Sequence, residues 1–214
     1  LDSRNPLRIP GVEHAQAEVT VTGGPLSEIA ILGLGKSGTA AAKLLLADGK
    51  RVYVSDAGSS AGVEDAARQL RDIGASVDTA RHDLARIARA EKVVVSPGID
   101  PSSPPIEAAR KAGRPLVSEI EIALGYLTGT KIIAVTGTNG KTTTTTLIGH
   151  VLRGLGENAV DAGNIGAPLS DFARHDARPD WIALEVSSFQ LHDTPSLAPD
   201  VGVLTNLSPD HLDP

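Results

Sequence analysis

The chain has 214 residues, of which 41% are hydrophobic and 2% aromatic, and its 20 basic and 26 acidic residues give a formal net charge of −6. This acidic balance argues against a general binder of nucleic acid or membrane surfaces, although a local phosphate site needs only a few backbone amides and one lysine. The sequence contains no cysteine, which excludes disulfides, thiol catalysis and thiolate metal sites. No apolar run approaches the roughly 18 residues of a membrane span, and no signal peptide is evident, so we expect a cytoplasmic protein.

The first part of the chain divides into an irregular segment and a regular one. We expect residues 1–27, which hold three prolines, to form a lead-in segment in which residues 19–22 can add an edge strand. From Glu28 onward, short apolar runs alternate with helical stretches that end at glycine. Strands are predicted at 29–32, 51–55, 93–96 and 115–117, and helices at 39–48, 63–73 and 105–112. This pattern predicts a Rossmann-like α/β domain over residues 28–128, with a parallel sheet covered on both faces.

A second α/β unit follows a linker at residues 125–130. Its strands are predicted at 131–136, 158–162, 181–185 and 201–204, with a helix at 141–155. This pattern predicts another parallel sheet over residues 129–214. The sequence has no methionine and stops at Pro214 in polar sequence, so we expect it to be a fragment.

The first glycine-rich loop, residues 33–38, has the sequence Gly-Leu-Gly-Lys-Ser-Gly and follows the first predicted strand. It fits the G-x-G-x-x-G pattern, in which bare backbone amides and a helix N-terminus receive a phosphate. Asp56 ends the next strand, where an acid can accept ribose hydroxyls. On its own this loop predicts a dinucleotide-binding oxidoreductase; the alternative is that the glycines merely allow tight strand–helix packing. The candidate ligand contacts are Gly35, Lys36, Ser37, Gly38 and Asp56, together with the strand-end turn Ser96, Pro97 and Gly98, which is otherwise a simple Pro-Gly turn.

The second glycine-rich loop follows the strand at 131–136 and is the stronger signal. It departs from the strict G-x-x-x-x-G-K-[ST] pattern because Val135 occupies the first glycine position. Backbone amides of this loop are expected to bind phosphate oxygens, Lys141 to reach the β and γ phosphates, and the Thr142 hydroxyl to bind Mg²⁺. Residues 129–214 are therefore predicted to be part of a P-loop ATPase-type domain. The candidate ATP contacts are Gly137, Thr138, Asn139, Gly140, Lys141, Thr142 and Thr143.

Two further side chains follow strands of the second unit. Glu185 closes the strand at 181–185, where a carboxylate beside a phosphate loop is well placed to hold Mg²⁺. An isolated acid at a strand end is more often a solvated charge, and the neighbouring loop is what favours the metal. His211 follows the strand at 201–204, and by itself a histidine in a loop is usually polar surface.

The order of motifs in the second unit resembles the Mur ligase family, the ATP-dependent ligases of peptidoglycan precursor synthesis. The motifs are residues 136–142, 163–166, 185–191, and Asn206 with residues 210–213. The Ser-Ser-Phe-Gln-Leu run after Glu185 most resembles the members that add D-glutamate, and the turn at residues 96–99 and the Ser-Glu-Ile-Glu run at 118–121 support that subfamily. The resemblance extends from about residue 28 to the end of the chain.

The resemblance implies a reaction and its participants. ATP phosphorylates the terminal carboxylate of UDP-N-acetylmuramoyl-L-alanine, the amine of D-glutamate attacks the acyl phosphate, and ADP and phosphate leave. ATP and Mg²⁺ are the implied cofactors, and the first glycine loop is implied to hold the uridine diphosphate rather than a nicotinamide cofactor. The implied catalytic residues are Lys141, Glu185 and His211, the implied metal ligands Thr142, Glu185 and His211, and the further implied substrate contacts Asn164, Ser187, Gln190 and His211. No nucleic acid or membrane partner is implied, and we expect a monomer.

Two departures from the family pattern qualify this expectation. Ala57 and Gly58 stand where some relatives place a hydroxyl and an arginine that hold the uracil. The family's carbamylated lysine and its third domain lie beyond His211 and would fall after Pro214, so we expect this chain alone to bind ligands weakly and to catalyse poorly. Two alternatives stay open: a NAD(P)-dependent dehydrogenase with an extra nucleotide domain, and a non-catalytic nucleotide-binding module.

Overall fold

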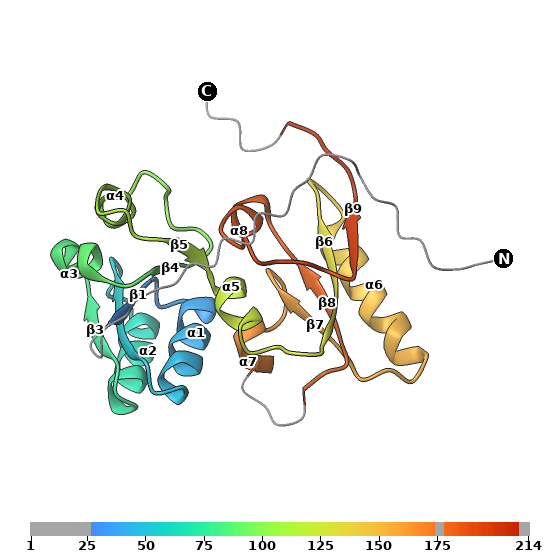
Figure 1. Cartoon of the computed structure of the whole chain (residues 1–214), viewed down its shortest axis with the longest axis horizontal. Coiled ribbons are helices and arrows are strands. Elements are labelled where there is room, and N and C mark those ends of the chain that lie inside the picture. The colour runs from blue at the N-terminus through green and yellow to red at the C-terminus, as the bar shows by residue number, and fades with distance from the viewer. Residues whose placement is uncertain (1–26, 174–177, 210–214) are drawn as a thin grey trace.

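The computed structural model describes residues 27–173 and 178–209, which form two parallel β-sheets with flanking helices (Figure 1). The first sheet has five strands in the order β3-β2-β1-β4-β5. Its strands are β1 (Glu28–Leu32), β2 (Arg51–Asp56), β3 (Ser76–Thr79), β4 (Val93–Val95) and β5 (Leu116–Ser118). The accompanying helices are α1 (Lys36–Ala47), α2 (Ala61–Asp72), α3 (Leu84–Arg89), α4 (Pro104–Lys111) and α5 (Glu119–Leu124).

The second sheet has four strands in the order β7-β8-β6-β9. They are β6 (Lys131–Thr136), β7 (Ala159–Gly163), β8 (Trp181–Glu185) and β9 (Val201–Leu204). The helices are α6 (Lys141–Gly154), α7 (Leu169–Ala173) and α8 (Ser188–His192). Because every neighbouring pair is parallel, the loops that leave the carboxyl ends of the strands collect at one edge of the sheet.

The alternation of side chains along β1 explains why the first sheet is covered on both faces. Ile29 and Ile31 point into a core shared with α1 and α2, whereas Ala30 and Leu32 pack in a separate core with α3 and α4. All four side chains are buried. A strand buried on both faces is apolar at consecutive positions, as this one is.

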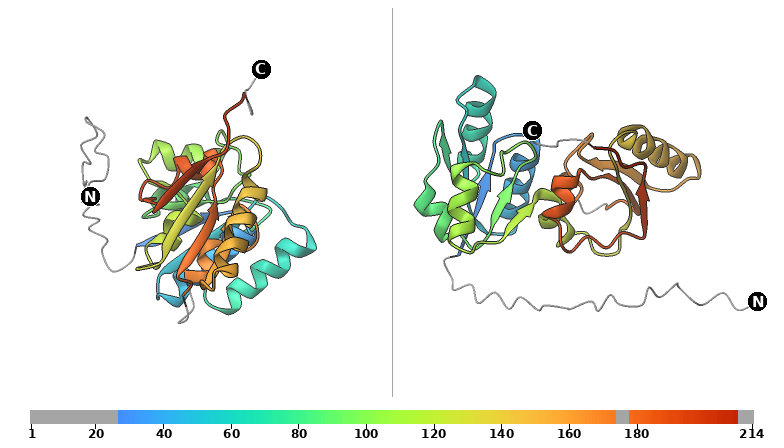
Figure 2. Two further views of the ribbon diagram at one scale, coloured as in Figure 1. Left: turned by 90° about the vertical axis from the view of Figure 1, so that its right-hand side faces the viewer. Right: turned by 90° about the horizontal axis from the view of Figure 1, so that it is seen from above.

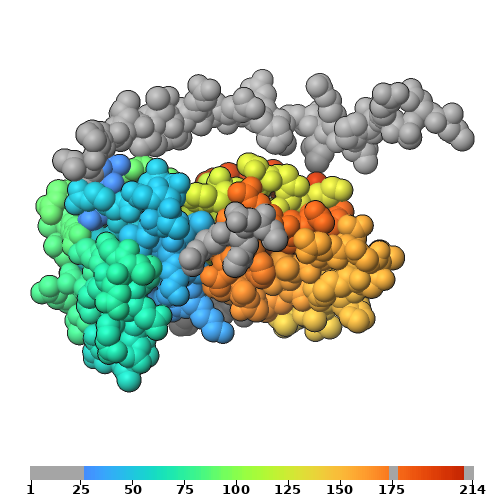
Figure 3. Space-filling model, turned by 90° about the horizontal axis from the view of Figure 1, so that it is seen from below, coloured from blue at the N-terminus to red at the C-terminus, as the bar shows by residue number. Residues whose placement is uncertain are grey.

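The two sheets form adjoining lobes that are joined by a continuous apolar core (Figures 1 and 2). Ile120 and Ala123 of α5 belong to the same core cluster as Leu169 of α7. Figure 3 shows the segment containing α1 directly against the segment containing α7, without a gap between the lobes on that side. The lobes are therefore packed against each other rather than connected only by a linker.

The strands predicted from sequence lie in the structure within about two residues of their predicted bounds, and the fold class is confirmed. Five elements were not predicted: β3, α3, α5, α7 and α8. The four helices among them have five or six residues, too few to produce an amphipathic period, so their signals are local caps such as Asp83 and Ser118. The predicted lead-in falls almost wholly on residues outside the described part of the chain, and the predicted domain limits stay a prediction.

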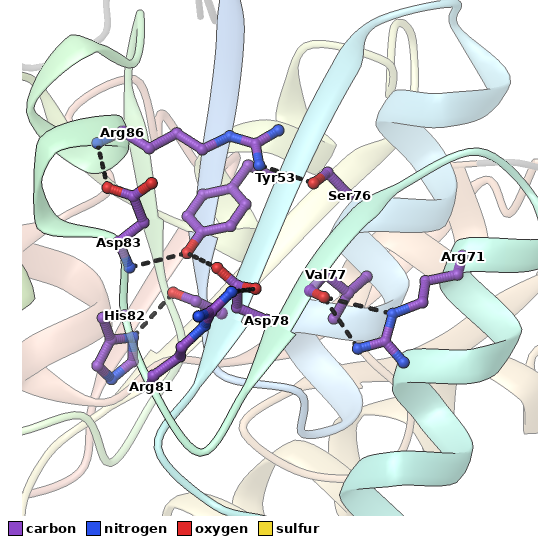
Figure 4. Close-up of polar contacts among 10 residues, drawn as sticks. Tyr53, Arg71, Ser76, Val77, Asp78, Arg81, His82, Asp83 and Arg86 are labelled. Carbon is purple, nitrogen blue, oxygen red and sulfur yellow. Dashed lines mark hydrogen bonds and ion pairs between the residues drawn. The ribbon is translucent and has the colours of Figure 1, made fainter.

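A polar network ties the β2–β3 side of the first lobe together (Figure 4). The Tyr53 hydroxyl donates to Asp78 Oδ2 at 3.1 Å and accepts from the Asp83 backbone amide at 3.0 Å. The Arg86 guanidinium lies 4.2 Å from the Tyr53 ring centroid and donates to Ser76 Oγ at 2.7 Å. It also binds Glu28 through two hydrogen bonds of 2.7 and 2.8 Å. One arginine thus joins β1, β2, β3 and α3.

This network gives a pH-dependent contribution to stability. The hydrogen bonds from Arg86 hold the pKa of the Glu28 carboxyl below its ordinary value of 4.5. A carboxyl whose pKa is lowered by folding stabilises the protein above pH 4.5, and that contribution is lost as the pH falls through the folded-state value. We expect Glu28→Gln to cost about 1–2 kcal/mol at pH 7, a typical range for a charge-assisted pair at a partly exposed position.

Urea unfolding of the wild type and of Glu28→Gln between pH 3 and pH 7 measures this contribution. The difference between the free energies of unfolding of the wild type and of Glu28→Gln should become smaller below pH 4.5. Glu157→Gln, at an exposed position after α6, is the control and should follow the wild type. A gap that stayed constant across the range would contradict the assignment.

Candidate nucleotide-binding sites

The loop between β6 and α6 is shaped by two glycines with left-handed backbone angles. Gly137 has φ of +134° and Gly140 has φ of +82°, conformations that side-chain-bearing residues rarely adopt. A Cβ at Gly137 would also overlap the Thr205 side chain. Local sequence therefore determines a tight turn directly before the helix.

Residues that follow β9 hold this loop in place. The Thr138 amide donates to the Asn206 carbonyl at 3.1 Å, and the Asn139 amide donates to Asn206 Oδ1 at 3.0 Å. Asn206 Nδ2 returns a hydrogen bond to the Asn139 carbonyl at 2.9 Å, and Thr205 Oγ1 donates to the same carbonyl at 2.7 Å. The loop is thus braced from a strand that lies about 70 residues further along the chain.

Lys141 curls back over the loop that precedes it. Its Nζ donates to the carbonyls of Gly137 at 2.8 Å and Thr138 at 2.9 Å. Within the described part of the chain no side chain caps the N-terminus of α6, so its first amides are available to an anion. An ammonium group and free amides at the same helix end form a site suited to phosphate oxygens.

Glu185 lies at the centre of the carboxyl edge, where β8 sits between β6 and β7. Its side chain is 2% exposed. Oε2 accepts a hydrogen bond from Thr142 Oγ1 at 2.9 Å, and Oε1 accepts one from Asn164 Nδ2 at 3.0 Å. One carboxylate and one hydroxyl beside a phosphate loop match the way Mg²⁺ is held, since this ion takes one or two protein oxygens and completes its shell with water and phosphate. Among the described residues no cluster of three or more His, Cys, Asp or Glu side chains forms a self-sufficient metal site.

The loop between β1 and α1 requires glycine at two positions. Gly33 has φ of +99°, and a Cβ at Gly38 would overlap the Gly33 carbonyl. Ser96, at the end of β4, lies beneath these two glycines. Its hydroxyl is buried and makes no hydrogen bond to any described residue. A buried hydroxyl without a protein partner is a candidate ligand contact.

Asp56 has a structural role in addition to the ligand contact expected of it. Its Oδ2 accepts the Leu34 amide and its Oδ1 accepts the Gly58 amide, both at 2.7 Å. The carboxylate therefore ties the loop after β1 to the loop after β2. It retains lone pairs for a ligand hydroxyl, so its predicted contact with substrate stays a prediction.

The two lobes enclose a cavity of about 290 Å³ between the first glycine loop and the β7–α7 loop. The structure brings six of the predicted substrate-binding residues to it: Gly35, Lys36, Ser37, Ser96, Pro97 and Asn164. Its remaining lining residues are Gly163, Gly166 and Pro168. A second cavity of about 440 Å³ shares Ser96 and Pro97 and extends past Gly98 to Gln190.

Three predicted residues are not among the described residues that line the 290 Å³ cavity, and their predicted ligand contacts stay predictions. Ser187 and Gln190 form a capping box at the start of α8, in which each side chain binds the other residue's backbone amide. His211 lies beyond residue 209, outside the described part of the chain. Sequence reasoning missed Thr205 and Glu119, whose contacts with remote segments leave no local signal.

Two protein-family models match the chain over most of its length. The model of the Mur ligase middle domain matches residues 135–214, and the model of the MurD-like N-terminal domain of Mur ligases matches residues 27–118. The chain belongs to the Mur ligase family.

Curated members of the Mur ligase family are similar to the chain at 41–44% identity. The UDP-N-acetylmuramoylalanine--D-glutamate ligase of Frankia casuarinae is 44% identical over 212 residues, which cover 99% of this chain and 44% of that protein. The enzyme of the same name from Koribacter versatilis is 41% identical over 185 residues, covering 86% of this chain and 41% of that protein. The chain thus spans less than half the length of these relatives.

A solved Mur ligase structure supports the fold. UDP-N-acetylmuramate:L-alanyl-gamma-D-glutamyl-meso-diaminopimelate ligase from Neisseria meningitides resembles the chain with a TM-score of 0.53 at 22% identity, over 88% of this chain and 63% of that one.

Within residues 27–173 and 178–209, no helix is both long and apolar enough to cross a bilayer.

Proposed function

We propose that this chain supplies the UDP-substrate-binding and ATP-binding parts of a ligase that joins D-glutamate to UDP-N-acetylmuramoyl-L-alanine, with conversion of ATP to ADP and phosphate. The names of relatives at 41–44% identity support the substrates. The observation that carries the chemistry is the group formed by Lys141, Thr142 and Glu185 at one sheet edge, linked through Asn164 to a cavity facing the other lobe.

The proposed reaction has two steps in which bonds and charges balance. An oxygen of the alanyl carboxylate attacks the γ phosphorus of ATP, so that an acyl phosphate forms and ADP leaves. The D-glutamate amine then attacks the acyl carbon, the amide forms, and phosphate leaves with the loss of the amine proton. Phosphoryl transfer of this kind needs positioning and charge neutralisation more than a nucleophilic side chain.

Each residue of the site has a role in this proposal. The amides of residues 140–142 and the Lys141 ammonium bind the β and γ phosphates, whereas the amides of Thr138 and Asn139 donate to Asn206. Thr142 and Glu185 hold Mg²⁺, which when bound neutralises charge on the transferring phosphoryl group. Asn164, which like Thr142 donates a hydrogen bond to the Glu185 carboxylate, lines the proposed substrate cavity. Lys36, Ser37 and Ser96 hold the diphosphate of the UDP substrate, and His211 remains a predicted metal and substrate contact.

Thermal-shift titration of the chain tests this assignment. UDP and Mg·ATP should each raise the melting temperature, and at about 100 times the dissociation constant we expect a gain of about 5–10 °C. NAD and NADP should leave the melting temperature unchanged. A melting temperature that rises with NAD or NADP but not with UDP would favour the dehydrogenase. A melting temperature that rises with none of these nucleotides would contradict the proposal.

The amino-acid acceptor needs a separate measurement. The complete gene product should release ADP only when both UDP-N-acetylmuramoyl-L-alanine and an amino acid are present, with D-glutamate preferred over L-glutamate and L-lysine. Nucleotide binding with neither ADP release nor an amide product would favour a non-catalytic nucleotide-binding module over a ligase.

A further inference from the structure

The β7–α7 loop, residues 164–168, forms one wall of the cavity between the lobes. Gly163, Asn164, Gly166 and Pro168 line it opposite the first glycine loop. This loop is anchored at its start, where the Asn164 amide and side chain bind the Glu185 carbonyl and carboxylate, both at 3.0 Å. Its far end is tied back to its start, because the Gly163 amide donates to the Ala167 carbonyl at 3.2 Å, and the chain enters α7 directly after Pro168.

Helix α7, which continues this loop, is bound by a carboxyl group from the other lobe. Glu119, the first residue of α5, is 1% exposed, and its Oε1 accepts the backbone amide of Ser170 in α7. Figure 1 shows α5 and α7 side by side at the junction of the lobes, in agreement with their contacts. Glu119 is thus the buried polar link between the first lobe and the segment that carries the cavity wall.

The cost of burying this group indicates a role beyond packing. Glu119 Oε2 and Ser170 Oγ are both buried without a hydrogen bond among the described residues. Burial also raises the pKa of the Glu119 carboxyl above its ordinary value. Burying a carboxyl costs free energy, which the contacts from Ser170 and the Leu169 amide at the start of α7 offset in part. Glu119 therefore couples its own placement to that of α7.

We propose that Glu119 is a positioning residue for the UDP-substrate site, which sets the distance of the 164–168 loop from the first glycine loop. This inference rests on the proposed function. Glu119 touches no ligand itself. It acts through the Ser170 amide, and the site it adjusts is the one that Lys36 and Ser37 face across the cavity.

The same helix provides a matched control. Glu121, two residues further along α5, also binds the second lobe, because its Oε2 accepts the Ser196 amide at 3.1 Å and the Ser196 hydroxyl at 2.8 Å. This contact is exposed and does not adjoin the cavity between residues 35–37 and 163–168. If the loss of any hydrogen bond between the lobes weakened UDP binding, Glu121→Ala would weaken it as much as Glu119→Ala.

Isothermal titration with UDP and, separately, with Mg·ATP tests the proposal. We expect Glu119→Ala to weaken UDP binding about tenfold while Mg·ATP binding stays within twofold. Glu119→Gln keeps an acceptor for the Ser170 amide and adds a donor for Ser170 Oγ, so it should bind UDP as the wild type does. Glu121→Ala should also bind UDP normally.

A spectroscopic readout separates positioning from general destabilisation. The amide resonances of Gly163 and Gly166 should shift in Glu119→Ala and return in Glu119→Gln. If Glu119→Ala does not fold, Glu119→Asp replaces it, since its shorter side chain withdraws the carboxylate from Ser170 and should weaken UDP binding relative to Glu119→Gln.

The outcomes distinguish this inference from the proposed function. A wild-type chain that bound Mg·ATP but no UDP would overturn the proposed function and this inference with it. A wild-type chain that bound UDP, with equal affinity in Glu119→Ala or Glu119→Asp, would overturn the inference alone.

Discussion

Replacing Lys141 with alanine should weaken Mg·ATP binding by about 10–100-fold, the loss expected for a charge-assisted contact to phosphate. In the structure the ammonium lies over the carbonyls of Gly137 and Thr138, within the loop that would surround the phosphates. In the complete gene product the loss in kcat should be larger, about 10²–10³-fold, because the positive charge acts on charge that develops during transfer. Titration with Mg·ATP and a steady-state ligation assay measure the two effects.

Lys36→Ala is the control for this experiment. Lys36 begins α1 at the other glycine loop and lines the cavity between the lobes. Lys36→Ala should weaken UDP binding and leave Mg·ATP binding unchanged, which is the reverse of the pattern expected for Lys141→Ala. Equal losses of both ligands in both variants would show that the two loops are not separate sites.

Replacing Gly149 with alanine should destabilise the second lobe by about 2–3 kcal/mol. Gly149 lies buried in α6, and a Cβ there would occupy the space of the Asp161 carboxylate. Arg153 binds the two Asp161 oxygens at 3.1 and 3.2 Å, so displacement of the carboxylate also disturbs this ion pair. Overpacking of this kind typically costs 1–3 kcal/mol, and here an ion pair is disturbed as well. The melting temperature should fall by about 5–10 °C.

Gly154→Ala tests whether the effect comes from the close contact or from the helix. Gly154 lies in the same helix, and no atom of the described residues is within 4 Å of a Cβ added there, so alanine should stabilise the helix by about 0.5 kcal/mol. Adding Asp161→Ala to Gly149→Ala should recover part of the lost stability, because it removes the overlapping group. Similar stabilities for the two alanine variants would rule out the steric explanation.

Much of the fold was predictable because its signals are local in sequence. Consecutive apolar residues followed by glycine indicate a buried parallel strand entering a helix, and both glycine loops lie where this rule places them. The short helices were not predictable in this way. α5 starts directly after Ser118, the last residue of β5, so this serine is both the strand end and the helix cap, and no loop separates the two elements.

The residue types at the site were predictable from the sequence, but most of their hydrogen-bond partners were not. Glu185 and Thr142 were expected to share a metal, and the structure places their side chains 2.9 Å apart although 43 residues separate them. That Asn164 completes this group, and that Asn206 braces the loop, depends on which strands lie beside β6 and β8. Asp56 was likewise recognised as an acid at a strand end, but its hydrogen bonds to two backbone amides were not predicted.

The sequence by itself therefore determined the α/β class, the two glycine loops and the residue types at the strand ends, since these follow from hydrophobic periodicity and from the backbone freedom of glycine. Only the tertiary structure decided which strand ends meet, which loops enclose the cavity and where Glu119 inserts between the lobes. The physical reason is that these contacts join segments 20 to 70 residues apart, whose meeting depends on strand order and on packing across the shared apolar core.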